Sequence, residues 1–175
     1  MKEIAIRPAT EADLEGMWEI FQATVARGDS YLFAPGTPKD VCYRYWFGEG
    51  INSHVAVLNK ERVLGMSRYL ANQAGLGDHV ANASFMVSPE AQGVGIGKLL
   101  GEHCLAAARA DGFLAMQFNF VVSTNLGAIS LWKKLGFEIV GTLPGAYRHL
   151  SRGYVDAYVM YLQLDDPLNW PVPAD

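Results

Sequence analysis

The sequence predicts a single mixed α/β domain over residues 1–175. The chain has 175 residues, half of them apolar and 18% charged, which is ordinary for one globular core. Apolar residues recur alternately at strand spacing and at helix spacing, in the order β-α-α-β-β-β-α-β-α-β-β. Two consecutive strand–helix units in the second half imply locally parallel strands, whereas the hairpin before them is antiparallel. A wholly parallel, doubly wound sheet is therefore disfavoured.

The first half of the chain divides at glycine, proline and capping residues. Thr10 and Asp13 resemble a capping box that starts a helix, and the segment GDSYLFAPGTPKD is too rich in Gly and Pro to continue it. Alternating apolar residues on both sides of a turn predict a hairpin. In order, the expected elements are a strand at 3–7, a helix at 11–27, a loop at 28–40, a helix at 40–49 and two strands within 54–71 around a turn at 59–61.

The second half alternates strands with helices. Pro89 closes one strand, a glycine turn opens the longest helix, and Asn125 is a good N-cap for the last helix. In order, the expected elements are a strand at 79–89, a helix ending near 110, a strand at 114–123, a helix at 125–136, strands at 137–143 and 154–164, and an irregular tail at about 165–175.

Composition and charge narrow the function classes. The formal net charge is −4 with no basic stripe, which argues against nucleic acid as the main partner. No stretch is apolar for long enough to cross a membrane, and the N-terminus lacks the apolar core of a signal peptide, so a cytoplasmic location is expected. Cys42 and Cys104 match no metal or redox spacing, so we expect reduced thiols and no metal site.

The segment EAQGVGIGKLL places Gly93, Gly95 and Gly97 where an apolar helix begins. The first turn of a helix leaves backbone N–H groups unpaired and carries the positive end of the helix dipole. A phosphate can bind there if no Cβ blocks its approach. The glycines therefore favour a pyrophosphate site. The alternative, a tight turn without a ligand, would be explained by one glycine better than by three.

Two common phosphate-binding loops do not fit this segment. A P-loop needs G-x-x-x-x-G-K followed by Ser or Thr, but Gln92 stands at the first glycine and Leu99 follows Lys98. A dinucleotide fingerprint needs G-x-G-x-x-G after an early strand, and the spacing here is G-x-G-x-G deep in the chain. Magnesium-dependent phosphotransfer and NAD binding are therefore disfavoured.

Two motifs together carry a family resemblance. QGVGIG, from Gln92 to Gly97, matches Q/R-x-x-G-x-G/A, and STNLGAISLWKKLGFEIVG is similar to N-x-x-A-x-x-x-Y-x-x-x-G-F. With these motifs in this order, the chain resembles the GNAT superfamily of N-acetyltransferases over nearly its whole length. The resemblance implies a mixed, mostly antiparallel central sheet with helices on both faces. It also implies acetyl-CoA as co-substrate and acetyl transfer to a primary amine by direct attack in a ternary complex.

The resemblance also implies a cofactor site on these motifs. Backbone groups on a bulged strand that splays from its neighbour would hold the pantetheine arm and polarise the thioester carbonyl. The glycine turn, braced by Gln92, would bind the pyrophosphate, and the helix that Asn125 caps would face the arm. The implied residues are Phe85, Met86, Val87, Gln92, Gly93, Val94, Gly95, Ile96, Gly97, Lys98, Asn125, Ala128 and Trp132.

The general acid and base are not identified by the sequence. Trp132 stands where many relatives carry a Tyr that protonates the thiolate, and an indole N–H cannot act as a general acid. The strand ANASFMV lacks a carboxylate; Asn82 and Ser84 alternate on it, and Gln117 and Asn119 alternate on the next strand. These polar side chains either line the acceptor cleft or bond to one another. The catalytic candidates are Asn82, Ser84, Asn119 and Tyr158.

The acceptor is expected to be a small-molecule amine. Tyr31 and Phe33, in the loop where the family builds a substrate wall, suggest a partly apolar pocket; Asp29 could attract an ammonium group, and Tyr147 is a further candidate. Two alternatives stay open: a catalytically silent domain that senses acyl-CoA, and a protein N-acetyltransferase. A homodimer is also left open.

Overall fold

The computed structural model describes residues 4–171, which form a seven-stranded sheet in the order β1-β2-β3-β4-β5-β7-β6. All neighbouring strands are antiparallel except β4 and β5, which are parallel. The mixed, mostly antiparallel sheet expected from the sequence is therefore confirmed. The strands are β1 (Ile4–Pro8), β2 (Asn52–Leu58), β3 (Arg62–Ala71), β4 (Val80–Val87), β5 (Ala115–Val122), β6 (Glu138–His149) and β7 (Gly153–Gln163).

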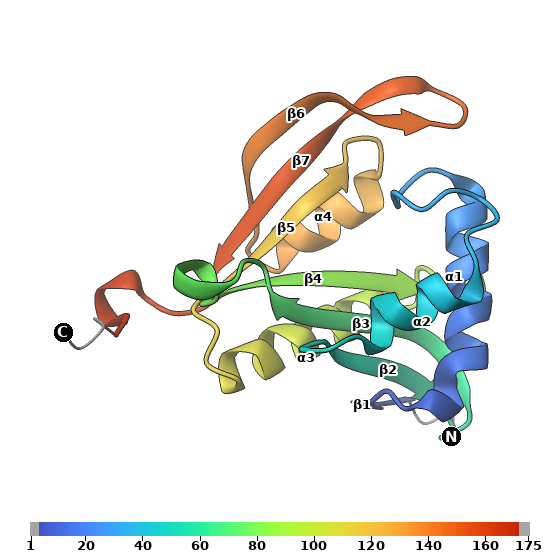
Figure 1. Ribbon diagram of the computed structural model, residues 1–175, viewed down its shortest axis with the longest axis horizontal. Coiled ribbons are helices and arrows are strands. Elements are labelled where there is room, and N and C mark those ends of the chain that lie inside the picture. Colours follow the sequence, from blue (N-terminus) through green and yellow to red (C-terminus); the bar gives the residue numbers. More distant parts are fainter. Residues whose placement is uncertain (1–3, 172–175) are drawn as a thin grey trace.

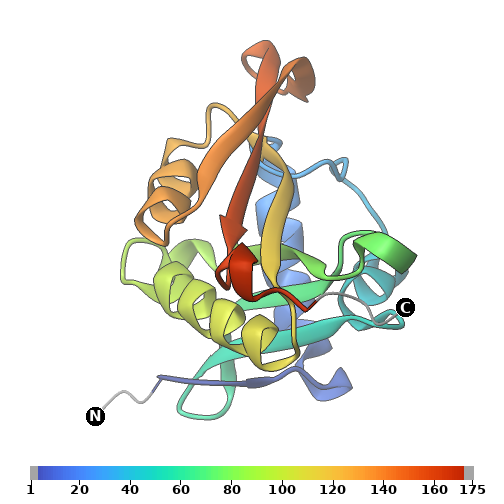
Figure 2. The same ribbon diagram turned by 90° about the vertical axis from the view of Figure 1, so that its left-hand side faces the viewer.

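Helices cover both faces of the sheet, as Figure 2 shows. On one face, α1 (Leu14–Arg27) and α2 (Lys39–Phe47) pack an apolar cluster that includes Trp46 and Met86. On the other face, α3 (Ile96–Ala110) and α4 (Leu126–Lys134) pack a second cluster that includes Trp132. Each helix buries one apolar stripe against the sheet, which is what holds the layers together.

The parallel strands β4 and β5 separate along their length. They pair at three positions only, from Val80↔Ala115 to Asn82↔Gln117, and then diverge (Figure 1). The sheet is therefore split into two halves at the carboxyl ends of these strands. The splay implied by the family resemblance is present, but the bulge is not in β4, whose pairing with β3 is regular. The register shift lies instead in β5, between Phe118 and Val121.

Local signals in the sequence explain most element boundaries. Thr10 and Asp13 form the predicted capping box, and the predicted turn after β2 contains Asn59 and Lys60, with φ values of 50° and 67°. Such positive φ values are typical of two-residue hairpin turns. None of the helices within residues 4–171 is long and apolar enough to span a membrane. The expected irregular tail includes a short 3-10 turn at Pro167–Asn169, and residues 172–175 lie outside the described part.

Strand β6 is longer than predicted. The predicted strand ends at residue 143, but pairing with β7 continues to His149↔Gly153. A register shift between Leu143 and Tyr147 absorbs the intervening Pro-Gly pair, and the Gly145 N–H donates to Asp156 Oδ1 at 2.8 Å instead of to a ladder partner. Proline is tolerated at such a bulge on an edge strand.

Candidate active site

The turn between β4 and α3 presents unpaired backbone N–H groups. Gly93 and Gly95 have φ values of 77° and 92°, and a Cβ built on either would meet no atom within 4 Å. Within residues 4–171, no N–H group from Gly93 to Lys98 donates to a protein acceptor; the first that does is that of Leu99, to Gly95 O at 3.0 Å. These N–H groups lie at the N-terminal end of α3, a helix of 15 residues. The arrangement fits an anion such as a pyrophosphate.

The remaining residues of the turn have different roles. A Cβ on Gly97 would lie 3.2 Å from Leu131, so this glycine allows α3 and α4 to approach closely. Val94 is exposed and Ile96 is buried beneath the turn. The exposed side chain of Gln92 makes no hydrogen bond within the described chain, so the structure does not show the bracing role predicted for it. Lys98 is exposed and pairs with Glu102 at 3.4 Å.

A cavity of about 470 Å³ fills the space where β4 and β5 diverge. Its walls come from β4, β5, α2, α4 and the loop after α1. Many of the residues proposed from the sequence meet here although they lie far apart in the chain. They are Tyr31, Phe33, Asn82, Ser84, Phe85, Asn119, Asn125, Ala128 and Trp132.

The backbone of Phe85 faces this cavity. The Ser88 N–H, just after β4, donates to Leu64 of β3, and the Val80 carbonyl oxygen accepts from Asn72, just after β3. The backbone groups of even-numbered β4 residues therefore face β3, and those of odd-numbered residues face the other side, toward β5 and the cavity. The Tyr31 hydroxyl accepts from the Phe85 N–H at 3.0 Å and donates to the Phe85 carbonyl oxygen at 2.5 Å. Burial raises the pKa of this hydroxyl well above its usual value. Tyr31 therefore uses both main-chain groups that Phe85 offers to the cavity.

Because the direction of the backbone groups alternates along β4, the residues of this strand that were predicted to contact the cofactor do not all face the gap. Phe85 and Val87 turn their backbone groups toward the gap between β4 and β5, as the predicted contacts require. Met86 does not, because its backbone faces β3 and its side chain lies in the core cluster beside α1 with 2% of its surface exposed. Met86 is therefore placed differently from Phe85 and Val87, with its backbone turned away from the gap.

Helix α4 forms one wall of the cavity. Asn125 caps the helix, and its Oδ1 accepts from the Ala128 N–H at 3.2 Å. The ring of Trp132 packs against those of Phe85 and Phe118, with centroid distances of 4.7 and 4.8 Å. Trp132 therefore supplies apolar surface beside Phe85, and α4 places no acidic side chain in the cavity wall.

The polar candidates on β4 and β5 line the cavity and are hydrogen-bonded at the same time. Asn82 donates to the Gln117 carbonyl oxygen at 3.0 Å. The Ser84 hydroxyl lies 2.5 Å from that of Tyr45, and Asn119 donates to Asn72 at 2.7 Å. Of these three bonds, only that of Asn82 joins β4 to β5, because Ser84 and Asn119 bond to residues outside the two strands.

Two predicted tyrosines lie outside the cavity wall. Tyr158 packs on the α3 and α4 face, against the cluster that contains Met160, because its side chain has the same parity along β7. Tyr158 is therefore not brought together with Asn82, Ser84 and Asn119 in the wall of this cavity. Tyr147 is buried, and its hydroxyl donates to the Tyr31 carbonyl oxygen at 3.1 Å, so it supports the loop after α1.

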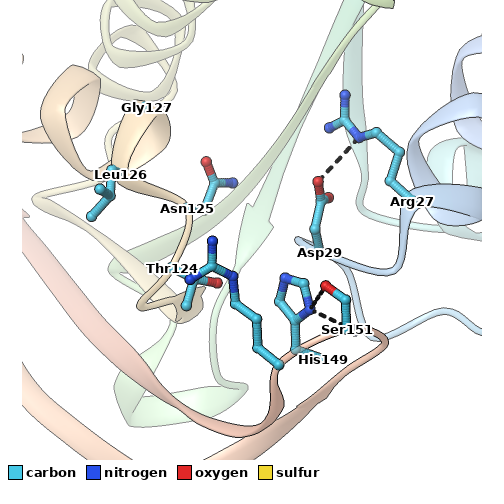
Figure 3. A pocket seen from close by; sticks show the side chains of 9 residues that line it. Arg27, Asp29, Thr124, Asn125, Leu126, Gly127, His149 and Ser151 are labelled. Atoms are coloured by element: carbon cyan, nitrogen blue, oxygen red, sulfur yellow. Dashed lines mark hydrogen bonds and ion pairs between the residues drawn. The ribbon is translucent and has the colours of Figure 1, made fainter.

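A polar pocket of about 510 Å³ lies beyond the end of β5 and shares Asn125 with the cavity (Figure 3). Asp29, which pairs with Arg27 at 3.4 Å, faces His149 across it. The His149 Nδ1 accepts from the Ser151 N–H at 3.2 Å. Both cationic and anionic groups line this pocket, which adjoins the cavity at Asn125.

Sequence reasoning missed Tyr45, Phe118 and Phe120, which line the cavity, and Arg68 beside it. The aromatic residues match the apolar periodicity of their elements and carry no separate signal. Arg68 does carry one, because it is a charged residue inside the otherwise uncharged run VLGMSRYLA of β3.

Comparisons with known proteins establish the family of the chain. Residues 15–137 match the model of the acetyltransferase (GNAT) family. The chain is 38% identical over 114 residues to the N-acetyltransferase aca1 of Schizosaccharomyces pombe, which covers 63% of this chain and 54% of the yeast protein. The chain thus spans about half the length of that relative. It is 30% identical over 177 residues to the L-methionine sulfoximine/L-methionine sulfone acetyltransferase of Pseudomonas aeruginosa, which covers 95% and 98% of the two chains.

Solved structures show the same fold. A GCN5-related N-acetyltransferase from Kribbella flavida superposes with a TM-score of 0.87 at 37% identity, which covers 91% of this chain and 97% of that one. A phosphinothricin acetyltransferase from Sinorhizobium meliloti in complex with AcCoA superposes with a TM-score of 0.84 at 25% identity, over 97% and 93% of the chains. The family match covers β2 to β5 and all four helices of the described chain except the first residue of α1. The chain belongs to the acetyltransferase (GNAT) family.

Proposed function

We propose that this acetyltransferase moves an acetyl group from acetyl-CoA to the primary amine of a small molecule, by direct attack in a ternary complex. One observation carries the proposal: the strand whose Phe85 backbone faces the cavity, β4, leads directly into the turn with free N–H groups from Gly93 to Lys98. A ligand that joins a pyrophosphate to an amide-bearing arm and a thioester matches both features. The AcCoA complex of the Sinorhizobium meliloti relative supports this choice of co-substrate.

The chain's own residues would bind, orient and shield the reacting groups. Acetyl-CoA, when bound, supplies the activated acetyl group. The Phe85 N–H donates to the carbonyl oxygen, on which negative charge develops as the amine attacks. The backbone groups of Val87 that face the gap would hold the pantetheine arm of acetyl-CoA. The ring of Trp132 would exclude water from the side of the cavity that α4 forms. The Tyr31 hydroxyl has to leave Phe85 before these contacts form.

The acceptor amine would enter from the side of Asn82, Ser84 and Asn119. The wall of the cavity contains no Asp or Glu side chain, so these polar groups hold the amine or a water that receives its proton. Tyr31 and Phe33 form an apolar wall that suits a small molecule. The relatives from Pseudomonas aeruginosa and Sinorhizobium meliloti are named for methionine sulfoximine, methionine sulfone and phosphinothricin, which supports a small acceptor over a protein.

A first experiment separates this proposal from a silent acyl-CoA sensor, which Trp132 at the expected Tyr position keeps under consideration. Thermal unfolding is measured with acetyl-CoA, and with ATP and NAD as controls. A ligand at about 100 times its Kd adds roughly 2.7 kcal/mol, which raises Tm by several degrees. A rise with acetyl-CoA followed by release of CoA thiol with an amine supports the enzyme. A rise without thiol release from any amine supports the sensor, and no rise contradicts both.

The glycine turn can be tested directly with Gly95→Glu. The new carboxylate would occupy the space at the unpaired N–H groups and repel the pyrophosphate, so acetyl-CoA should no longer raise Tm. Gly112→Glu is a matched control, because Gly112 has a φ of 88° and a Cβ there also meets no atom within 4 Å. It lies after the other end of α3. Unchanged acetyl-CoA affinity in Gly95→Glu would show that the pyrophosphate binds elsewhere.

We also propose that the protein works in the cytoplasm and does not use nucleic acid as a partner. Both Cys42 and Cys104 are free and buried, which suits a reducing compartment. The net charge of −4 disfavours binding to a phosphate backbone. Light scattering on the purified protein decides between a monomer and a homodimer.

A further inference from the structure

Arg68 is a buried cation without a counter-ion. It lies on β3 with 9% of its surface exposed, and its guanidinium carbon is 3.5 Å from the centroid of the Tyr45 ring. Its Nε is buried without a hydrogen-bond acceptor. Within residues 4–171, Arg68 forms neither an ion pair nor a hydrogen bond, whereas Arg7 pairs with the buried Asp13 at 2.7 Å.

Such an arrangement is costly for a folded chain. Arginine is almost never fully buried unless it is paired, because the guanidinium loses its hydration. The Tyr45 ring offers a cation–π contact but no acceptor for the N–H groups. A ligand with an anionic oxygen would supply both the hydrogen-bond acceptor and the counter-charge that Arg68 lacks.

The position of Arg68 assigns this ligand to the acceptor side. Arg68 pairs with Ser84 across β3 and β4, and directly opposite residues share one face of a sheet. Ser84 and Tyr45 both line the cavity and bond to each other at 2.5 Å. The charge of Arg68 also acts on the Tyr31 hydroxyl, where it opposes the rise in pKa that burial causes.

The same position excludes the phosphates of the cofactor as the partner of Arg68. Met66, two residues before Arg68 on β3, belongs to the core cluster under α1 and α2. Because side chains two residues apart share a face, Arg68 also lies on that face. The pyrophosphate donors belong to the N-terminus of α3, and α3 covers the opposite face.

We propose that Arg68 binds a carboxylate of the acceptor, so that the substrates are primary amines that also carry a carboxylate, as amino acids do. This inference rests on the proposed function and names its substrate class. A guanidinium presents parallel N–H donors that match the two oxygens of a carboxylate, and the Tyr45 ring fixes its plane. The amine at the other end of such an acceptor would lie near Asn82 and Ser84, on the path to Phe85.

The test compares matched acceptors and matched variants. CoA release is measured with standard L-amino acids and with their α-amides, and kcat/KM is expressed per neutral amine to correct for the different amine pKa values. The wild-type protein should prefer acids over amides by at least tenfold. Arg68→Met should lose this preference without a change in the KM for acetyl-CoA. Arg44→Met, an exposed α2 arginine paired with Asp40, removes the same charge and should keep the preference.

The outcomes separate this inference from the function on which it rests. A wild-type protein that acetylates amides as well as acids overturns the assignment of Arg68 and leaves the proposed function intact. If Arg68→Met folds and still prefers acids over amides, the assignment of Arg68 is likewise overturned and the proposed function stays intact. If Arg68→Met does not fold, Arg68→Lys decides, because it keeps the charge but loses the planar pair of donors and should lower the preference severalfold. CoA release from no amine at all overturns the proposed function itself.

Discussion

At the scale of single residues, the contact between Tyr31 and Phe85 is the most informative in the cavity. The phenol hydroxyl acts as donor and acceptor to the two backbone groups of one β4 residue, at 2.5 and 3.0 Å. An incoming acetyl-CoA would need the same two groups. The Tyr31 hydroxyl therefore stabilises the free protein relative to its complex with acetyl-CoA.

This competition predicts that Tyr31→Phe binds acetyl-CoA more tightly. Loss of the hydroxyl leaves the buried Phe85 groups unpaired, which should destabilise the free protein by about 1–3 kcal/mol. The complex keeps its hydrogen bonds, so Kd from calorimetry should fall by about fivefold, or about 1 kcal/mol. Tyr43→Phe, which removes an exposed hydroxyl bonded to Glu11 at 2.8 Å, is the control. A weaker Kd in Tyr31→Phe would mean that the hydroxyl contributes to the complex.

Some of these residues could be predicted from the sequence and others could not. The turn between β4 and α3 could be predicted, because three glycines directly before an apolar helix have few structural explanations. Tyr31 could be expected to line a pocket, but its hydroxyl contact joins residues 54 positions apart and depends on the path of an irregular loop. Arg68 could be noticed only as an unusual charge in an apolar strand, since its lack of a partner is a property of the packing.

At the scale of elements, α3 and β2 bring together two histidines with unpaired ring nitrogens. The rings of His54 and His103 have centroids 4.6 Å apart, and the Nδ1 atoms of both are buried without a partner. Burial lowers the pKa of both side chains; for His54 the neighbouring His103 lowers it further and Asp111 opposes this. The folded protein therefore favours the neutral form of both rings.

This pair predicts that stability falls as the pH is lowered from about 7 to about 5. The histidines titrate near pH 6.5 in the unfolded chain and at a lower pH in the folded one, so the unfolded state binds more protons in this window. Their contribution is fully present above pH 7. Denaturant unfolding of His103→Gln should show a shallower pH dependence than the wild type between pH 5 and 7, and the same dependence between pH 7 and 8. Equal slopes below pH 7 would exclude the pair as the cause.

The elements themselves were largely predictable because their signals are local. Alternation, helical periodicity and capping residues gave the order of strands and helices correctly. The extension of β6 was not predictable, because Pro144 and Gly145 normally end a strand, and only the pairing with β7 carries the strand past them. Strand order and the gap between β4 and β5 are set by long-range pairing, and the family motifs, not periodicity, pointed to the gap.

At the scale of the whole molecule, two half-sheets are joined at one end and bridged at the other. The three β4–β5 pairs join them at the closed end of the gap. At the open end, the loop after α1 contacts both halves: Tyr31 bonds to Phe85 of β4, and its carbonyl oxygen accepts from Tyr147 of β6. The Leu150 N–H, after β6, also donates to Gly28 O at 3.4 Å. This loop therefore connects the two half-sheets across the open end of the gap.

If acetyl-CoA displaces Tyr31, the protein should respond in opposite directions at two places. The free N–H groups from Gly93 to Lys98 should exchange more slowly with solvent deuterium when they bind a pyrophosphate. The loop over 28–38 should exchange faster, because it loses its hydrogen bonds to Phe85. Hydrogen exchange with mass spectrometry, with and without acetyl-CoA, measures both segments in one experiment. In Tyr31→Phe the loop should already exchange fast in the free protein, while the turn should still be protected on binding. Protection of the loop in the wild-type complex would instead mean that the loop closes over the cofactor, with Tyr31 kept in the cavity.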